Sequence, residues 1–119
     1  LLRDTRVKML SFTGGVEVGW KLKGEAVKQK VTLELGGNAA CLVEPDSDWR
    51  KHAGKMAVGA FAYAGQSCIS VQRIFVRAEI YGEFREVFLG EVAGRAKAGD
   101  PADPATLVGP MINREALEK

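Results

Sequence analysis

The stretch PDSDWRKHAGKMAVGAFAYAG, residues 45–65, places its apolar side chains on one side of a helix. The apolar positions follow i, i+3, i+4 spacing and are Trp49, Ala53, Met56, Ala57, Ala60, Phe61 and Ala64. This spacing predicts an amphipathic helix, and it is the clearest helix signal in the chain. Ser47 or Asp48 is expected to cap the N-terminus of this helix, and Gly65 is expected to end it.

Short apolar segments on both sides of this helix have the composition of strands. The segments expected as strands are 7–12, 31–35, 39–43 and 71–77, and those expected as helices are 16–29, 45–65 and 79–97. Val31, Leu33 and Leu35 alternate with polar residues, whereas AACLV is a continuous apolar run, as expected of a strand covered on both faces. Strands that alternate with helices predict an α/β fold with a largely parallel sheet.

The other expected helices differ in strength. The first places Val16, Trp20 and Val27 on one side, but two internal glycines weaken it. The last long helix has a clearer apolar face, formed by Ile80, Phe84, Val87, Phe88 and Val92. After a loop rich in Pro, Gly and Asp, Asn113 is expected to cap a short final helix.

The composition is that of an ordinary globular protein. Hydrophobic residues make up 46% and charged residues 27% of the 119 residues, which fits one modest domain. The net charge of +2, from 17 basic and 15 acidic residues, is too balanced to indicate nucleic acid or an anionic membrane as a partner. No apolar run reaches membrane-spanning length, and the start lacks the apolar core of a signal peptide. The two cysteines form no metal-ligand set, so we expect a cytoplasmic protein with reduced thiols and no metal.

Cys68, at the end of YAGQSC, has two interpretations. Free cysteines are among the most buried residues, which favours a packed core thiol. The residue also follows a helix-ending glycine and precedes a turn into a strand, where backbone N–H groups could stabilise a thiolate or an oxyanion. Cys41 lies within an apolar strand, and there the core interpretation is the simpler one. The single histidine, His52, lies about four helical turns from Cys68 at about 1.5 Å per residue, so a Cys-His hydrolase lacks its base and His52 is interpreted as structural.

Two further segments are site candidates. Glu34 is by position the solvent-side residue of an alternating strand. That strand runs into Gly36 and Gly37, and ligands of open α/β sheets gather at the carboxyl ends of strands, so Glu34 is also a general-base candidate. GGVEVG at 14–19 follows a strand and opens a helix. It is either a plain turn or a phosphate-binding helix N-terminus that lacks the GxGxxG fingerprint.

Taken in order, four motifs resemble those of the aldehyde dehydrogenase superfamily. They are FTGGVEVG (12–19) for the cofactor turn, LELGGN (33–38) for the general-base segment, GQSC (65–68) for the nucleophile segment, and GDPADPATLVGP (99–110) for a G(D/N)P-x-D-x-x-T-x-x-GP loop. The match covers nearly all of the chain, and the joint spacing makes it specific.

Members of that family are several times longer than this chain, so the resemblance implies an incomplete, aldehyde-dehydrogenase-like α/β fold. Residues 1–36 would be the C-terminal part of a Rossmann-like NAD(P)-binding domain. Residues 37–119 would be the N-terminal part of the catalytic domain, which carries the nucleophilic cysteine. The start without methionine also indicates an internal fragment of a longer protein.

The resemblance implies an NAD- or NADP-dependent oxidation of a small aldehyde to a carboxylic acid. Cys68 would attack the aldehyde to give a thiohemiacetal, hydride loss would give a thioester, and Glu34 would activate the water that hydrolyses it. The residues that would contact the cofactor are Gly14, Gly15, Val18, Gly19, Leu35 and Gly36. Gln66 would shape the nucleophile turn, and the full-length enzyme would be a homo-oligomer. YAGQSCISVQR is most similar to the branch that acts on small hydroxyaldehydes or semialdehydes.

The chain departs from the family pattern in ways that bear on the cofactor. Gly15 stands where members usually carry serine, and Ala39 and Ala40 replace a polar residue and a proline. The segments that complete the cofactor site and the substrate tunnel in the family are not among these 119 residues. The alternative is therefore a non-catalytic α/β fragment without a complete cofactor site.

Overall fold

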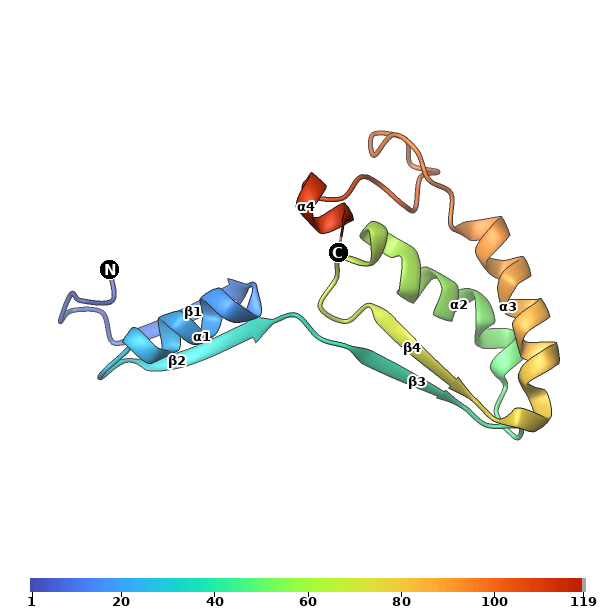
Figure 1. The fold of residues 1–119 in the computed structure, drawn as a ribbon, viewed down its shortest axis with the longest axis horizontal. Coiled ribbons are helices and arrows are strands. Elements are labelled where there is room, and N and C mark those ends of the chain that lie inside the picture. The colour runs from blue at the N-terminus through green and yellow to red at the C-terminus, as the bar shows by residue number, and fades with distance from the viewer. Residues whose placement is uncertain (119) are drawn as a thin grey trace. The chain divides into compact units, whose positions relative to one another are not determined.

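The computed structural model describes residues 1–118, which divide into two compact units. The first unit is Leu1–Gly37, and the second begins at Asn38. Each unit contains its own two-stranded sheet, and in both sheets the strands run parallel (Figure 1). The expected α/β fold with parallel strands is confirmed, with two small sheets in place of one. The identity of the units as parts of a cofactor domain and a catalytic domain stays a prediction.

The first unit is a strand, a helix and a second strand. Its elements are β1 (Met9–Gly14), α1 (Val16–Glu25) and β2 (Lys30–Leu35). The strands pair from Met9 opposite Lys30 to Gly14 opposite Leu35, so β1 runs on past the predicted end at residue 12. In β2 the alternation predicted for 31–35 is confirmed, because every second residue is partly buried.

Helix α1 differs from its prediction in length and in the face it buries. It ends at Glu25 and does not reach residue 29. Val16 and Trp20 are 50% and 56% exposed, so the predicted apolar face is wrong. The buried residue is Gly19, where a Cβ would lie 2.5 Å from a methyl carbon of Leu35. The helix approaches β2 through this glycine, and the side chains next to it are left outside the contact.

The second unit has two helices packed on one face of a parallel strand pair. Its elements are β3 (Ala39–Val43), α2 (Trp49–Phe61), the short 3-10 helices η1 (Ala62–Gly65) and η2 (Ala78–Ile80), β4 (Val71–Val76), α3 (Tyr81–Arg95) and α4 (Arg114–Leu117). Helices α2 and α3 lie side by side (Figure 1). Among residues 1–118, no helix combines the length and the hydropathy needed to cross a membrane.

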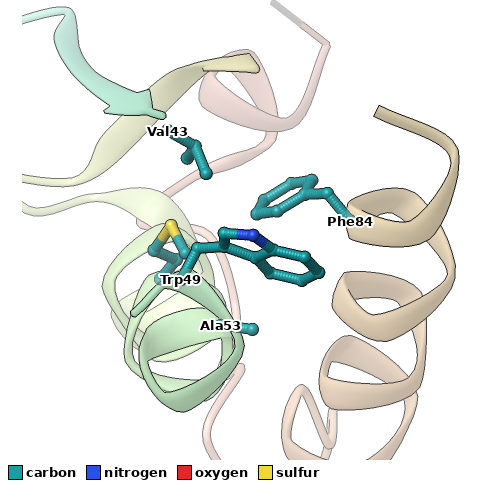
Figure 2. Close-up of a cluster of buried hydrophobic side chains, with 5 residues drawn as sticks. Val43, Trp49, Ala53 and Phe84 are labelled. Atoms are coloured by element: carbon teal, nitrogen blue, oxygen red, sulfur yellow. The ribbon is translucent and has the colours of Figure 1, made fainter. Parts of the chain in front are cut away.

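The core of the second unit forms where α2 and α3 meet the sheet. Figure 2 shows Trp49 and Ala53 of α2 beside Val43 of β3 and Phe84 of α3. The rings of Trp49 and Phe84 are 5.6 Å apart between centroids, and Phe84 stacks on Phe88 at 5.5 Å. The apolar stripe predicted for α2 and the predicted face of α3 are therefore confirmed at these core positions.

Strand β3 is not covered on both faces, contrary to the prediction from its apolar run. Cys41 and Val43 face the helices and belong to the core cluster. Leu42 and its ladder partner Phe75 lie on the other face and are 74% and 50% exposed. A continuous apolar run is typical of strands covered on both faces, but the described residues of this unit cover one face.

The ends of α2 also differ from their predictions. Asp48 occupies the N-cap position without a side-chain cap hydrogen bond, and the Ser47 hydroxyl donates to the Glu44 carbonyl. At the other end the α-helix stops at Phe61, and a 3-10 turn carries the chain to Gly65. The predicted Asn113 cap is confirmed, because its Oδ1 accepts from the Ala116 N–H at 2.8 Å.

The turn after α2 contains three successive residues with left-handed backbone conformation. Tyr63 and Ala64 have φ values of 54° and 55°, and Gly65 has a φ of 73°. Two of the three are not glycine, and the left-handed conformation costs an L-residue about 1–2 kcal/mol. Such strain persists only where the surrounding structure holds it in place.

Two helical glycines give contrasting predictions for the α2–α3 contact. A Cβ on Gly90 would meet no atom within 4 Å, so Gly90→Ala should raise the free energy of unfolding by about 0.5–1 kcal/mol. A Cβ on Gly54 would lie 2.6 Å from Glu91 Oε2 and 2.7 Å from Arg95 Nε. Gly54→Ala must displace the Glu91–Arg95 ion pair. It should therefore raise the free energy of unfolding by less than Gly90→Ala does, or not at all. Urea unfolding measures both, and an equal gain at Gly54 would contradict the close helix approach.

Ala64 gives a prediction about the strained turn. Ala64→Gly should raise the free energy of unfolding by up to about 1 kcal/mol, because glycine adopts a positive φ without steric cost. Ala62, with φ −55° and ψ 139°, is the matched control. Ala62→Gly should lower the free energy of unfolding by about 0.4–1 kcal/mol, because glycine raises the entropy of the unfolded chain. Thermal unfolding of both variants tests this. A similar loss at the two positions would contradict the left-handed assignment.

Candidate active site around Cys68

Cys68 lies in the short turn between η1 and β4. The residue is exposed, whereas Cys41 is partly buried, with its sulfur 3.6 Å from the Met56 sulfur. The core interpretation therefore fits Cys41 and does not fit Cys68 in this structure. A thiol on an exposed turn can reach a small molecule, which is the first requirement of a nucleophile.

The turn around Cys68 is tied to the rest of the unit on both sides. Ser70 is 2% exposed, and its hydroxyl donates to the Ala60 carbonyl at the end of α2. On the other side, the Gln66 side chain donates a hydrogen bond to the Pro110 carbonyl and accepts one from the Ile112 N–H. Both anchors lie within two residues of Cys68. The sequence predictions named Gln66 but missed Ser70, whose only local signal is its place directly before an apolar strand.

The backbone of the turn leaves donors unpaired. The Gln66 N–H donates to the Tyr63 carbonyl, and the Ser70 N–H to the Ser67 carbonyl. Between them, within the part of the chain that the structure describes, the N–H groups of Ser67, Cys68 and Ile69 donate to no carbonyl. Unpaired N–H groups of exposed residues beside a thiol are suited to hold a developing oxyanion.

The Pro- and Asp-rich loop that follows α3 is ordered by its own hydrogen bonds. The carboxylates of Asp100 and Asp103 accept from backbone N–H groups two residues on, at 2.9 and 2.8 Å. The Lys97 carbonyl accepts from both Leu107 and Val108. These Asx turns and the closing backbone bonds make the loop a compact unit that can present its final residues in a fixed direction.

A hollow of about 1290 Å³ lies between the end of α2 and the segment after this loop. Phe61, Gln66, Pro110 and Leu117 are among the residues that line it, but Cys68 is not. Its lining is mainly apolar and lacks the thiol. We therefore assign no substrate to this hollow.

Glu34 and the cofactor candidates belong to the first unit, and Cys68 belongs to the second. Glu34 is exposed in β2 and pairs with Thr13 across the ladder. Gly14 ends β1 opposite Leu35, and Gly15 is the N-cap of α1. The structure thus brings the candidates together at the carboxyl ends of both strands, where ligands of parallel sheets bind.

The same end of the first unit fits a nucleotide phosphate group in its local geometry. Gly15 has φ −66° and ψ 144°, and a Cβ there would meet nothing within 4 Å, so phosphate oxygens can approach the first N–H groups of α1. Val18 is 50% exposed and Gly36 is exposed, whereas Gly19 is buried against Leu35. Val18 and Gly36 are accessible to a ligand, and Gly19 acts through helix packing.

Known proteins resemble this chain over its whole length. The model of the aldehyde dehydrogenase family matches residues 1–119. The putative aldehyde-dehydrogenase-like protein y4uC of Sinorhizobium fredii is 43% identical over 100% of this chain and 23% of its own length. The probable succinate-semialdehyde dehydrogenase (NADP(+)) of the same organism is 40% identical over 100% of this chain and 24% of its own length.

The solved structures agree with the sequence relatives. Aldehyde dehydrogenase 21 of Physcomitrella patens, in complex with the reaction product succinate, superposes with a TM-score of 0.85 and 42% identity over 97% of this chain and 24% of that one. The chain thus spans about a quarter of the length of the relatives it matches. The full-length match to the family model shows that the chain belongs to the aldehyde dehydrogenase family.

Proposed function

We propose that the protein carrying this chain oxidises a small aldehyde to a carboxylic acid with NAD or NADP, and that Cys68 is its nucleophile. The observation that carries the proposal is an exposed Cys68 on a turn anchored by Gln66 and Ser70, in a chain of this family. The non-catalytic alternative concerns the 119-residue chain by itself, and it is motivated by the absence of the segments that complete the cofactor site in the family.

The first chemical step is addition of the Cys68 thiolate to the aldehyde carbon. A C–S bond forms, and the carbonyl electron pair moves to oxygen, which becomes an oxyanion. The unpaired N–H groups of Ser67, Cys68 and Ile69 are the donors that would hold this charge. Donors fixed in an anchored turn need no reorganisation when the charge develops, which is where their catalytic value lies.

The cofactor, when bound, supplies the hydride acceptor for the second step. The exposed end of the first unit would hold it, through the N–H groups at the start of α1 and through Val18 and Gly36. Loss of hydride from the carbon leaves a thioester on Cys68. Glu34 would then take a proton from water, the resulting hydroxide would attack the thioester, and the Cys68 thiolate would leave.

The substrate class proposed here is a small semialdehyde or hydroxyaldehyde. The YAGQSCISVQR segment favours that branch, and one relative is a probable succinate-semialdehyde dehydrogenase. Assembly into a homo-oligomer and a cytoplasmic location belong to the same proposal.

Cys68→Ala tests the nucleophile. In the intact protein, aldehyde oxidation followed at the reduced nicotinamide absorbance should fall by about 10⁴-fold or more, the scale of nucleophile loss in other enzymes. Cys41→Ala is the matched control and should retain turnover, because Cys41 packs beside Met56 in the core. Turnover that survives in Cys68→Ala would remove Cys68 from the mechanism. Absence of turnover by the 119-residue chain alone, on a panel of small aldehydes, would favour the non-catalytic alternative for this chain.

Glu34→Gln tests the general base. Hydride transfer should persist while hydrolysis slows by about 10²–10⁴-fold, because the amide cannot accept a proton from water. Rapid-mixing experiments should then show one equivalent of reduced cofactor per site, followed by slow turnover, and mass spectrometry should find the acyl group on Cys68. Glu25→Gln, at the far end of α1, should behave as wild type. Unchanged steady-state turnover with no acyl-enzyme would exclude Glu34 as the base.

A further inference from the structure

The amide of Gln66 forms three hydrogen bonds, and two of them join segments far apart in the sequence. Its Nε2 donates to the Tyr63 carbonyl at 3.0 Å and to the Pro110 carbonyl at 3.3 Å. Its Oε1 accepts from the Ile112 N–H at 2.9 Å. The contacts with Pro110 and Ile112 span 44 and 46 residues. One side chain therefore links the turn that carries Cys68 to the end of the loop after α3.

Among the described residues, the hydrogen bonds that the 110–112 segment forms are those with Gln66. The Ile112 side chain is 83% exposed, so burial of that side chain does not fix it. The loop before it closes on itself through the bridge between Ala98 and Val108, and α4 begins only at Arg114. Between those two ordered parts Met111 is partly buried, and the hydrogen bonds from Gln66 attach the segment to the Cys68 turn.

The same amide also supports the strained backbone before Cys68. The Tyr63 carbonyl accepts from the Gln66 backbone N–H at 3.1 Å and from its side-chain Nε2 at 3.0 Å. Tyr63 and Ala64 are both left-handed without being glycine, and such residues need support from their surroundings. Gln66 thus connects the strained residues on one side of the turn with the remote segment.

We propose that Gln66 is a positioning residue, whose amide clamps the Pro110–Ile112 segment to the turn and thereby sets the position in which Cys68 reacts. The proposal rests on the nucleophilic role of Cys68 proposed above. It requires both halves of an amide, because the two carbonyls need a donor and the Ile112 N–H needs an acceptor. Glutamate keeps only the acceptor, and methionine has a similar length with neither function.

Hydrogen exchange at the Ile112 amide tests the clamp without substrate or cofactor. In Gln66→Met, exchange of this N–H should accelerate by about fivefold to tenfold, as loss of one hydrogen bond implies. Gln66→Glu should lie between wild type and Gln66→Met, since its carboxylate still accepts. Gln29→Met is the matched control, because it removes a hydrogen bond from a side-chain amide to the Leu2 carbonyl in the first unit. Exchange at the Ile112 N–H should be unchanged in this variant. Unchanged exchange at Ile112 in Gln66→Met would overturn the clamp.

Turnover per active site tests the positioning. We expect kcat per titrated Cys68 to fall at least about tenfold in Gln66→Met, less in Gln66→Glu, and KM for the cofactor to stay unchanged, because the loss concerns the reacting geometry and not ground-state binding. A purely structural role would lower the number of titratable sites and leave kcat per site intact. Faster exchange at Ile112 with an unchanged kcat per site would overturn the positioning role.

The two measurements separate this inference from the proposed function. A wild-type protein that oxidises no aldehyde contradicts the proposed function and, with it, the catalytic consequence of the clamp. The exchange result still decides whether the clamp itself exists. A wild-type protein that is active, with Gln66→Met equally active per site, contradicts the inference and leaves the proposed function in place.

Discussion

The packing of Trp49 against Phe84 is the contact on which the second unit depends. It joins the start of α2 to α3 above the β3–β4 sheet, and Ala53 and Ala57, both fully buried, let the helices approach closely. Helix α2 is thereby fixed along its length. Because the strained turn follows directly at the end of α2, the core places the start of the turn that carries Cys68.

The candidate site combines this rigid support with local strain. Ser70 fastens the end of the turn to the Ala60 carbonyl of α2, and Gln66 fastens its beginning to a distant segment. Between these two anchors, three backbone N–H groups donate to no carbonyl of the described residues, and Cys68 is exposed. Rigid elements that hold a short and strained stretch of backbone are a common way to present reactive groups.

Much of the architecture follows from local sequence patterns, and the exceptions have physical causes. The stripe from Trp49 to Ala57 predicted the core face of α2, because apolar side chains at helical spacing need a partner surface. The end of α2 could not be predicted, because Tyr63 and Ala64 have no local preference for a left-handed backbone. In this turn the backbone N–H and the side-chain amide of Gln66 both donate to the Tyr63 carbonyl. The motifs identified the family and the candidate residues, but no local pattern indicates that the amide of Gln66 reaches Pro110 and Ile112.

The exposed apolar face of the β3–β4 sheet has a thermodynamic consequence for this chain. Leu42 and Phe75 are already largely in contact with water in the folded state, as are Val16 and Trp20 in the first unit. The heat capacity of unfolding grows with the apolar surface that becomes hydrated, and the denaturant m-value grows with the total surface exposed. Both should therefore be smaller than those of a typical domain of 119 residues. The stability of the chain then varies little with temperature, and its denaturant transition is broad.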